Sequence, residues 1–164
     1  SFTKFVASYY VVSEGGKRAT KQGGNNWYPA IAGTVIEPNS GVHVWGVEVL
    51  VTANSYIMFG VCAENASETT TNLYNTAAAA AIYGHDGHRY GTLGTQAGSN
   101  GWRDGVSPTA GDTITLTLDT TAGTLTFAKN GHLAQASFSN LQGKRVRPFI
   151  TMHDNTDSVR FVKL

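Results

Sequence analysis

The chain has little cysteine, little charge and no long apolar run. Its 164 residues include one cysteine, Cys62, which cannot form a disulfide within the chain and is typical of a reducing compartment. Only 14% of the residues are charged, the formal net charge is +1, and the Lys and Arg residues are scattered, whereas nucleic-acid-binding proteins usually show a basic face. No stretch approaches the roughly 18 apolar residues that span a membrane. We therefore expect a cytoplasmic or otherwise intracellular protein that binds neither nucleic acid nor membrane.

Patterns typical of catalysis and of metal binding are also absent from the sequence. His85 and His88 lie in a glycine-rich turn, without the further ligands at the spacing that zinc sites use. Residues 153–157 offer oxygen ligands but lack the glycine and the distal glutamate of a calcium loop. There is no G-x-S-x-G stretch and no complete phosphate-binding loop. The sequence predicts no catalytic residue, no metal and no cofactor.

The most informative pattern is an alternation in residues 113–118, where threonine alternates with isoleucine or leucine. A period of two is typical of a half-buried strand, and β-branched threonine suits one. Asp119 begins a turn, residues 124–127 return as a partner strand, and Asn130 with Gly131 favours a tight hairpin. This region predicts a β-meander.

The rest of the chain consists of short apolar stretches separated by turns, and its 19 glycines are spread along it. We expect further strands at residues 2–12, 41–51, 56–63, 147–152 and 158–162. We expect 56–63 to pair with 41–51, and the last two strands to form a closing hairpin. Residues 77–81 have helical propensity, but we interpret them as a loop leading into a short strand at 82–83.

These elements predict an all-β fold, a two-layer antiparallel β-sandwich. Because no linker or internal repeat interrupts the pattern, we expect residues 1–164 to form a single domain. The chain begins at Ser1 without Met, so we also expect this domain to be part of a longer multidomain protein.

The order of these elements resembles the SPRY domain family, also called B30.2. The family's W-x-V-E-V strand is matched by residues 45–49, and its glycine-valine step by residues 59–62. A G-D-x-I-x-x-x-L-D segment is matched by residues 111–119, and G-x-L-x-F with a following N-G by residues 123–131. A Pro-Phe strand is matched by residues 148–149. The resemblance implies a concanavalin-like jelly roll that acts as a monomeric, non-catalytic interaction module.

In this family, loops at one end of the sandwich bind a short peptide or a protein partner. By resemblance, the corresponding loops here are the segment around residues 27–29 and the loops 64–75, 98–107 and 153–157. Trp, Tyr and Arg dominate interface hot spots, so we predict a partner-binding site from these loops. Its residues are Tyr28, Pro29, Tyr74, Trp102, Arg103 and His153, with Asp154 as a polar orienting group.

Three tryptophans divide between core and surface in this interpretation. Trp45 lies on a strand and is expected in the core, whereas Trp102 lies among glycines and is expected to be exposed. For Trp27 both positions stay open. Two alternative functions also stay open. One is a carbohydrate-binding sandwich that stacks sugars on exposed aromatic rings, and the other is a structural domain packed within a larger protein.

Overall fold

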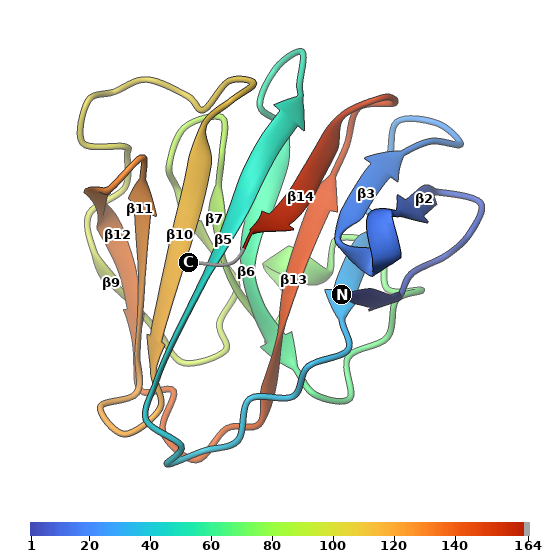
Figure 1. Cartoon of the computed structure of the whole chain (residues 1–164). Coiled ribbons are helices and arrows are strands. Elements are labelled where there is room, and N and C mark those ends of the chain that lie inside the picture. Colours follow the sequence, from blue (N-terminus) through green and yellow to red (C-terminus); the bar gives the residue numbers. More distant parts are fainter. Residues whose placement is uncertain (163–164) are drawn as a thin grey trace.

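Two antiparallel β-sheets pack face to face, as Figure 1 shows. The structure is a computed structural model, and it describes residues 1–162. The smaller sheet has six strands in the order β1-β4-β13-β6-β7-β8, and the larger sheet has eight in the order β2-β3-β14-β5-β10-β11-β12-β9. The predicted two-layer antiparallel sandwich is confirmed.

The strands are short, and the helical content consists of two 3-10 turns. The smaller sheet contains β1 (Phe2–Lys4), β4 (Pro29–Ala32), β6 (Ile57–Ala63), β7 (Ala79–Tyr83), β8 (Arg89–Tyr90) and β13 (Val146–Met152). The larger sheet contains β2 (Tyr10–Ser13), β3 (Arg18–Lys21), β5 (Val42–Val51), β9 (Thr95–Gly98), β10 (Thr113–Asp119), β11 (Thr124–Lys129), β12 (His132–Ser139) and β14 (Ser158–Val162). The 3-10 turns are η1 (Glu14–Gly16) and η2 (Leu73–Asn75). Within residues 1–162, no helix is long and apolar enough to cross a membrane.

The predicted meander is confirmed as β10, β11 and β12, which pair in sequence order. Its apolar side chains point inward and are buried, while the threonines between them are partly exposed. Asp119 Oδ1 accepts hydrogen bonds from two backbone N–H groups of the first turn, as Asp commonly does. Asn130 and Gly131 both take positive φ angles in the second turn. Local turn chemistry therefore accounts for both chain reversals, while a bulge between Thr126 and Ala128 shifts the register of β11 against β12.

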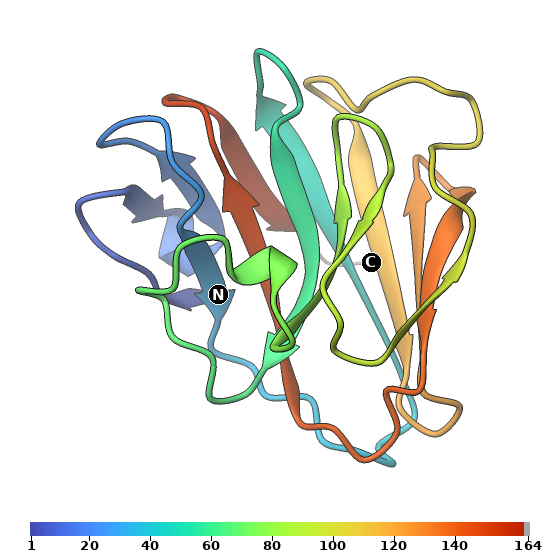
Figure 2. The ribbon, with the colours of Figure 1, turned by 180° about the vertical axis from the view of Figure 1, so that it is seen from behind.

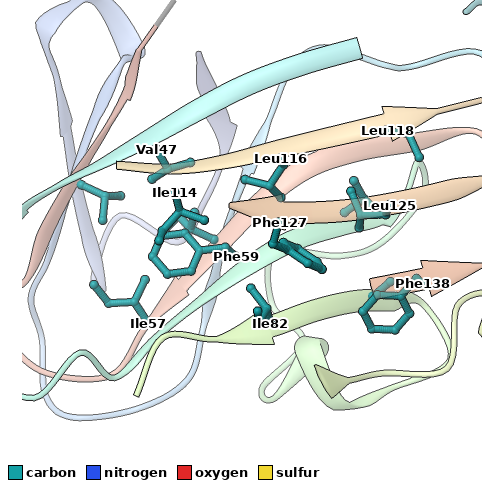
Figure 3. Packing of buried hydrophobic residues seen from close by; sticks show 14 of the residues in the cluster. Val47, Ile57, Phe59, Ile82, Ile114, Leu116, Leu118, Leu125, Phe127 and Phe138 are labelled. Carbon is teal, nitrogen blue, oxygen red and sulfur yellow. The ribbon is translucent and has the colours of Figure 1, made fainter. Parts of the chain in front are cut away.

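The main core lies between the two sheets (Figure 3). Ile57, Phe59 and Ile82 from the smaller sheet face Ile114 and Phe127 from the larger sheet, and all five are fully buried. Removing a buried ring such as Phe59 or Phe127 typically costs about 3–5 kcal/mol. This core holds the two sheets, and therefore the loops at their ends, in fixed relative positions.

Two predicted pairings are wrong, because consecutive strands cross from one sheet to the other. β5 pairs with β10 and β14, whereas β6 pairs with β13 and β7. In the same way, β13 lies in the smaller sheet and β14 in the larger one, so these strands form no closing hairpin. Turns of five residues, 52–56 and 153–157, lead from one layer to the other. A short polar turn can join strands of one sheet or of two, and its sequence does not distinguish them.

Two predicted strand boundaries also change. The segment predicted as one strand at 2–12 is divided into β1 and β2, which lie in different sheets. The backbone turns between them, where the N–H groups of Tyr9 and Tyr10 donate to the Val6 carbonyl oxygen. β7 begins at residue 79 instead of 82. Its alanines suit a tight pairing with β6, since any side chain at Gly60 would overlap the Ala80 carbonyl oxygen. Close backbone packing overrides helical propensity here.

A second, smaller core lies on the outer face of the smaller sheet. Residues 64–78, which include η2, cross this face, as Figure 2 shows from behind. They bury a cluster of apolar side chains: Ile31, Met58, Cys62, Ala66, Leu73, Ala79, Ala81 and Phe149. Cys62 is fully buried, and its burial raises the pKa of the thiol to about 12. The smaller sheet is therefore covered on both faces over part of its area.

Candidate functional site

Four connections meet at one end of the sandwich, next to the outer face of the smaller sheet (Figure 2). They are residues 22–28 before β4, 52–56 before β6, 84–88 after β7, and 153–157 after β13. Because β4 and β6 begin where β7 and β13 end, the antiparallel pairing brings all of these segments to the same edge. This is the end at which a binding site can be assembled from several loops.

These connections and their neighbouring strands gather aromatic rings on that outer face. We call this group the aromatic patch, and its members are Trp27, Tyr56, Tyr74, Tyr83, His85, Tyr90 and His153. Neighbouring ring centroids lie 5.0 to 6.1 Å apart, the range in which aromatic rings attract one another. His85 is exposed and the others are half-buried, so the rings of the patch are packed together but still reach the protein surface.

Four of these rings form a closed circuit. Trp27 lies 5.8 Å from Tyr83, which lies 6.1 Å from Tyr56. Tyr56 lies 5.9 Å from His153, and His153 lies 5.0 Å from Trp27. The rings are tilted or perpendicular to one another, with interplanar angles of 31° to 75°. Each ring therefore restrains two others, although they come from four separate segments of the chain.

Strand alternation and one backbone hydrogen bond place these rings. Tyr83 follows Ala79 and Ala81 on the outward side of β7, at the strand's end. Trp27 is tied to the covering segment, because the Asn72 N–H donates to the Trp27 carbonyl oxygen at 3.0 Å. The 3-10 turn η2 then brings Tyr74 to within 5.2 Å of Trp27. The long loop predicted to be functional thus supplies one wall of the patch.

A short polar network fixes one side of the patch. His153 Nδ1 donates to Asp154 Oδ1 at 2.6 Å, and Asn54 Nδ2 donates to Asp154 Oδ2 at 2.8 Å. His85 Nδ1 lies 3.1 Å from the Asn54 carbonyl oxygen. Burial opposes ionisation of Asp154, but the bonds from His153 and Asn54 outweigh it and hold the pKa of this carboxyl below its ordinary value. Asp154 is therefore a carboxylate at neutral pH, and it fixes the orientation of the His153 ring.

Three tyrosine hydroxyls of the patch, those of Tyr74, Tyr83 and Tyr90, stay protonated over the physiological range. Burial raises the pKa of Tyr74, Tyr83 and Tyr90, and the negative charge of Asp86 acts in the same direction on Tyr83 and Tyr90. Neutral phenols can donate as well as accept hydrogen bonds. The patch thus combines ring faces, hydroxyl donors and two nearby carboxylates, Asp86 and Asp154.

Five of the predicted site residues lie in the patch or next to it. Tyr74 and His153 belong to it, and Asp154 Oδ1 accepts a hydrogen bond from the His153 ring. Tyr28 lies beside it, packed on the main core and stacked on Tyr9 with 4.2 Å between ring centroids. Pro29 is buried as the first residue of β4. The structure therefore brings Tyr74, His153 and Asp154 together and leaves Tyr28 and Pro29 as supports.

The predicted exposure of Trp102 is wrong. Its side chain is only 5% exposed and closes one end of the main core, where its Nε1–H donates to the Gly84 carbonyl oxygen at 2.7 Å. Gly87 makes this possible, because a Cβ there would lie 2.5 Å from the Trp102 backbone nitrogen. The neighbouring glycines thus signal close backbone packing and not exposure.

Arg103 is exposed as expected but lies apart from the patch. Its Nε–H donates to the Leu133 carbonyl oxygen at 2.9 Å, and it lines a hollow of about 200 Å³ with Asp104 and His132. A larger cavity of about 240 Å³ lies between the sheets at the opposite end, beside Trp45. Trp45 is half-buried against the main core, broadly as expected. Neither hollow is lined by a ring of the aromatic patch, whose side chains are half-buried or exposed.

Sequence reasoning missed four tyrosine and tryptophan members of the patch or left them undecided: Trp27, Tyr56, Tyr83 and Tyr90. For two of them the sequence carried a signal of a position at the edge of the sheet. Tyr56 and Tyr83 lie at the ends of apolar strands, where side chains reach the rim of a sheet. Their proximity depends on the order of strands in the sheet. In the described part of the chain, no group of three or more His, Cys, Asp or Glu side chains is arranged to hold a metal.

Comparisons with known proteins agree with this architecture. The family model described as "SPRY domain" matches residues 42–163. A search of the curated proteins found no match. Among solved structures, the SPRY domain of human HERC1 has a TM-score of 0.73 at 20% sequence identity, covering 94% of this chain and 92% of that chain. A second human SPRY domain has a TM-score of 0.67 at 17% identity, covering 95% and 98%. The TRIM65 PSpry domain has a TM-score of 0.67 at 11% identity, covering 100% and 93%.

Proposed function

The chain belongs to the SPRY domain family, and on that basis we propose that it binds a short segment of a partner protein through the aromatic patch. SPRY domains are known as protein-interaction modules and are generally non-catalytic. The proposal adds a location on this chain and a kind of ligand to that general role.

The observation that supports it is the set of half-buried rings at one end of the outer face of the smaller sheet. Trp and Tyr offer a large apolar area with a polar edge, and they are enriched among residues that dominate binding energy. A folded domain gains more by burying such rings fully than by leaving them half-open. Rings that stay half-open and adjacent are therefore good candidates for contact with a partner.

The patch is also preorganised. Trp27, Tyr56, Tyr83 and His153 hold one another in the four-ring circuit, and Asp154 fixes the His153 ring. Binding then immobilises few additional side chains, each of which would cost about 0.5–1.5 kcal/mol to order. A short peptide with little contact area can therefore bind measurably.

We propose a non-catalytic role for the His153–Asp154 pair. A hydrolytic triad needs a nucleophilic hydroxyl or thiol within hydrogen-bond reach of the histidine. Among the described residues, the side-chain hydrogen bond of His153 is made to Asp154 alone. The pair therefore acts as an orienting element of the binding surface.

A random-peptide display selection on the 164-residue chain tests this proposal. The informative variant is Tyr56→Ala, because Tyr56 contacts Tyr83, His85 and His153 yet lies outside both apolar clusters. The matched control is Arg103→Ala, which alters an exposed side chain away from the patch. We expect a shared motif on the wild type and on Arg103→Ala, lost on a folded Tyr56→Ala variant.

Two outcomes would contradict the proposal. A motif that survives Tyr56→Ala but disappears with Arg103→Ala would locate binding at the hollow beside Arg103. No enrichment on the folded wild type would remove short peptides as ligands and direct the search to folded partner surfaces, to glycans or to a structural role.

A further inference from the structure

Within residues 1–162, no lysine or arginine side chain lies over a ring of the aromatic patch, although two carboxylates lie beside it. In the described part of the chain, lysine ammonium groups lie over other rings: Lys21 Nζ is 5.2 Å from the centroid of Tyr9, and Lys129 Nζ is 5.9 Å from that of Trp102. Both lysines are buried. The fold thus supplies a cation to aromatic rings at two other places and leaves the largest aromatic group without one.

The carboxylates beside the patch also have no arginine or lysine partner among the described residues. Asp154 bonds to His153 and Asn54, and Asp86 accepts from the His88 backbone N–H at 2.9 Å. Their side chains are 14% and 34% exposed. His88 Nδ1 also lies 3.6 Å from Asp86 Oδ2. Both carboxylates remain open in part to a ligand.

The arginines of the chain are engaged at other sites. Arg145 pairs with Glu37 and Glu64, and Arg160 pairs with Glu14 and Glu48. Remaining arginines donate to other acceptors: Arg18 to Ser158 Oγ, Arg89 to Asn100 and to backbone carbonyls, and Arg103 and Arg147 to backbone carbonyls. No arginine of the described part is thus directed at the patch, which leaves its ring faces free for a cation supplied by a ligand.

Resting on the proposed function, we infer that the anchor of the bound segment is an arginine side chain, whose guanidinium stacks on the four-ring circuit and pairs with Asp154. A planar guanidinium stacks on ring faces and offers several N–H donors to a carboxylate and to hydroxyl groups. A lysine ammonium is a compact and strongly hydrated charge that gains more from a closed cage. The open surface of the patch therefore favours arginine.

The test uses three small probes: Nα-acetyl-arginine amide, its citrulline counterpart and its lysine counterpart. Citrulline keeps the shape of arginine but has no charge. Nuclear magnetic resonance of the whole chain reports on the indole N–H of Trp27, with the buried Trp102 indole as an internal reference. We expect Trp27 to shift with arginine and to saturate with a Kd of about 1–10 mM, while Trp102 stays unchanged. Citrulline should give no saturating shift, and lysine should bind at least about threefold more weakly.

Two variants connect the binding to the proposed contacts. Asp154→Asn keeps a similar shape without the charge and should weaken arginine binding about three- to tenfold. Tyr56→Leu removes one ring face and should weaken it about threefold. Arg103→Ala is the control, because it alters an exposed side chain away from the patch. Thermal melting of each variant shows whether it is folded before binding is measured.

Equal shifts for arginine and citrulline, or no shift with arginine, would overturn the inference, and lysine binding as tightly as arginine would overturn the choice of residue. This failure is distinguishable from failure of the proposed function. If display selection yields a motif that needs the patch, but replacing its arginines by citrulline leaves the affinity unchanged, the peptide-binding role stands and the arginine anchor does not.

Discussion

Trp27 and Trp102 both lie in connections at the same end of the sandwich, yet their surroundings are opposite. Trp102 is 5% exposed, its indole N–H is bonded to the Gly84 carbonyl oxygen, and Lys129 lies over its ring. Trp27 is half-buried among other rings on the outer face of the smaller sheet. Among residues 1–162, Trp102 thus has an acceptor for its indole N–H and a lysine over its ring, and Trp27 has neither.

The difference separates a residue that stabilises the fold from one that is available to a ligand. A buried indole with a satisfied N–H contributes its full apolar area to folding. A half-buried indole stabilises the fold less and can gain further burial when a partner binds. Variants at the two positions should therefore affect different measurements.

Trp102→Ala should have the largest effect, a loss of about 3–5 kcal/mol in the free energy of unfolding, because it leaves a cavity between the sheets. It also leaves the Gly84 carbonyl oxygen without its donor. Urea unfolding followed by circular dichroism measures this loss. As a control, Trp102→Phe keeps most of the ring but removes the N–H and should cost less. A loss under about 1 kcal/mol for Trp102→Ala would contradict a core role.

Gly87→Ala should have the next largest effect, because Gly87 lies in the connection 84–88 beside the aromatic patch and packs against the backbone of Trp102. It takes a φ of +73°, and a Cβ there would lie 2.5 Å from the Trp102 backbone nitrogen. Strain and overlap together should cost about 2–3 kcal/mol, measured by urea unfolding. Gly105→Ala is the matched control, since Gly105 has a φ of +69° with nothing within 4 Å of an added Cβ. Equal losses for both variants would show that the close approach to Trp102 contributes nothing.

Trp27→Ala should act mainly on binding, with a loss of about 1–2 kcal/mol in affinity for a selected peptide. Its cost in stability should be smaller than that of Trp102→Ala, because Trp27 is only half-buried. Isothermal titration calorimetry with wild type and variant measures the affinity. An unchanged affinity with a large loss of stability would reverse the roles assigned to the two tryptophans.

Much of the fold follows from local sequence patterns. The threonine alternation in β10 and the turn residues Asp119, Asn130 and Gly131 predict the meander, because strand period and turn geometry are local properties. The crossing of β5 to β6 from one sheet to the other is not local, since a short polar turn serves either connection. These local patterns therefore could not predict the order of strands in the sheets, on which the site depends.

The candidate site was predictable only in part for the same reason. Tyr74, His153 and Asp154 come from loops that the family resemblance identifies, and they lie together. Tyr83 joins them through the pairing of β7 with β6, which is a long-range contact. The burial of Trp102 depends on how closely the turn at residues 84–88 approaches it. The glycines next to Trp102 in the sequence are compatible with a buried or an exposed side chain.

The last expected effect depends on pH and concerns Lys21, which holds the connection that carries Trp27. Its ammonium donates to the carbonyl oxygens of Gln22 and Gly24 at 2.7 and 2.6 Å, and burial lowers the pKa of Lys21 to about 8. An unfolded lysine has a pKa of about 10.4, so between these values the unfolded chain binds more protons than the folded chain. The contribution of Lys21 to stability should therefore rise with pH across this window and stay constant below it.

The measurement compares wild type with Lys21→Met by urea unfolding at about pH 7.5 and about pH 9.5. Taking the difference between the two proteins cancels titrations that they share, including that of Cys62. We expect this difference to grow in favour of the wild type at the higher pH. Lys17→Met, which removes an exposed lysine, is the control. A Lys21→Met difference that is independent of pH would mean that the Lys21 ammonium is as well solvated in the fold as in the unfolded chain.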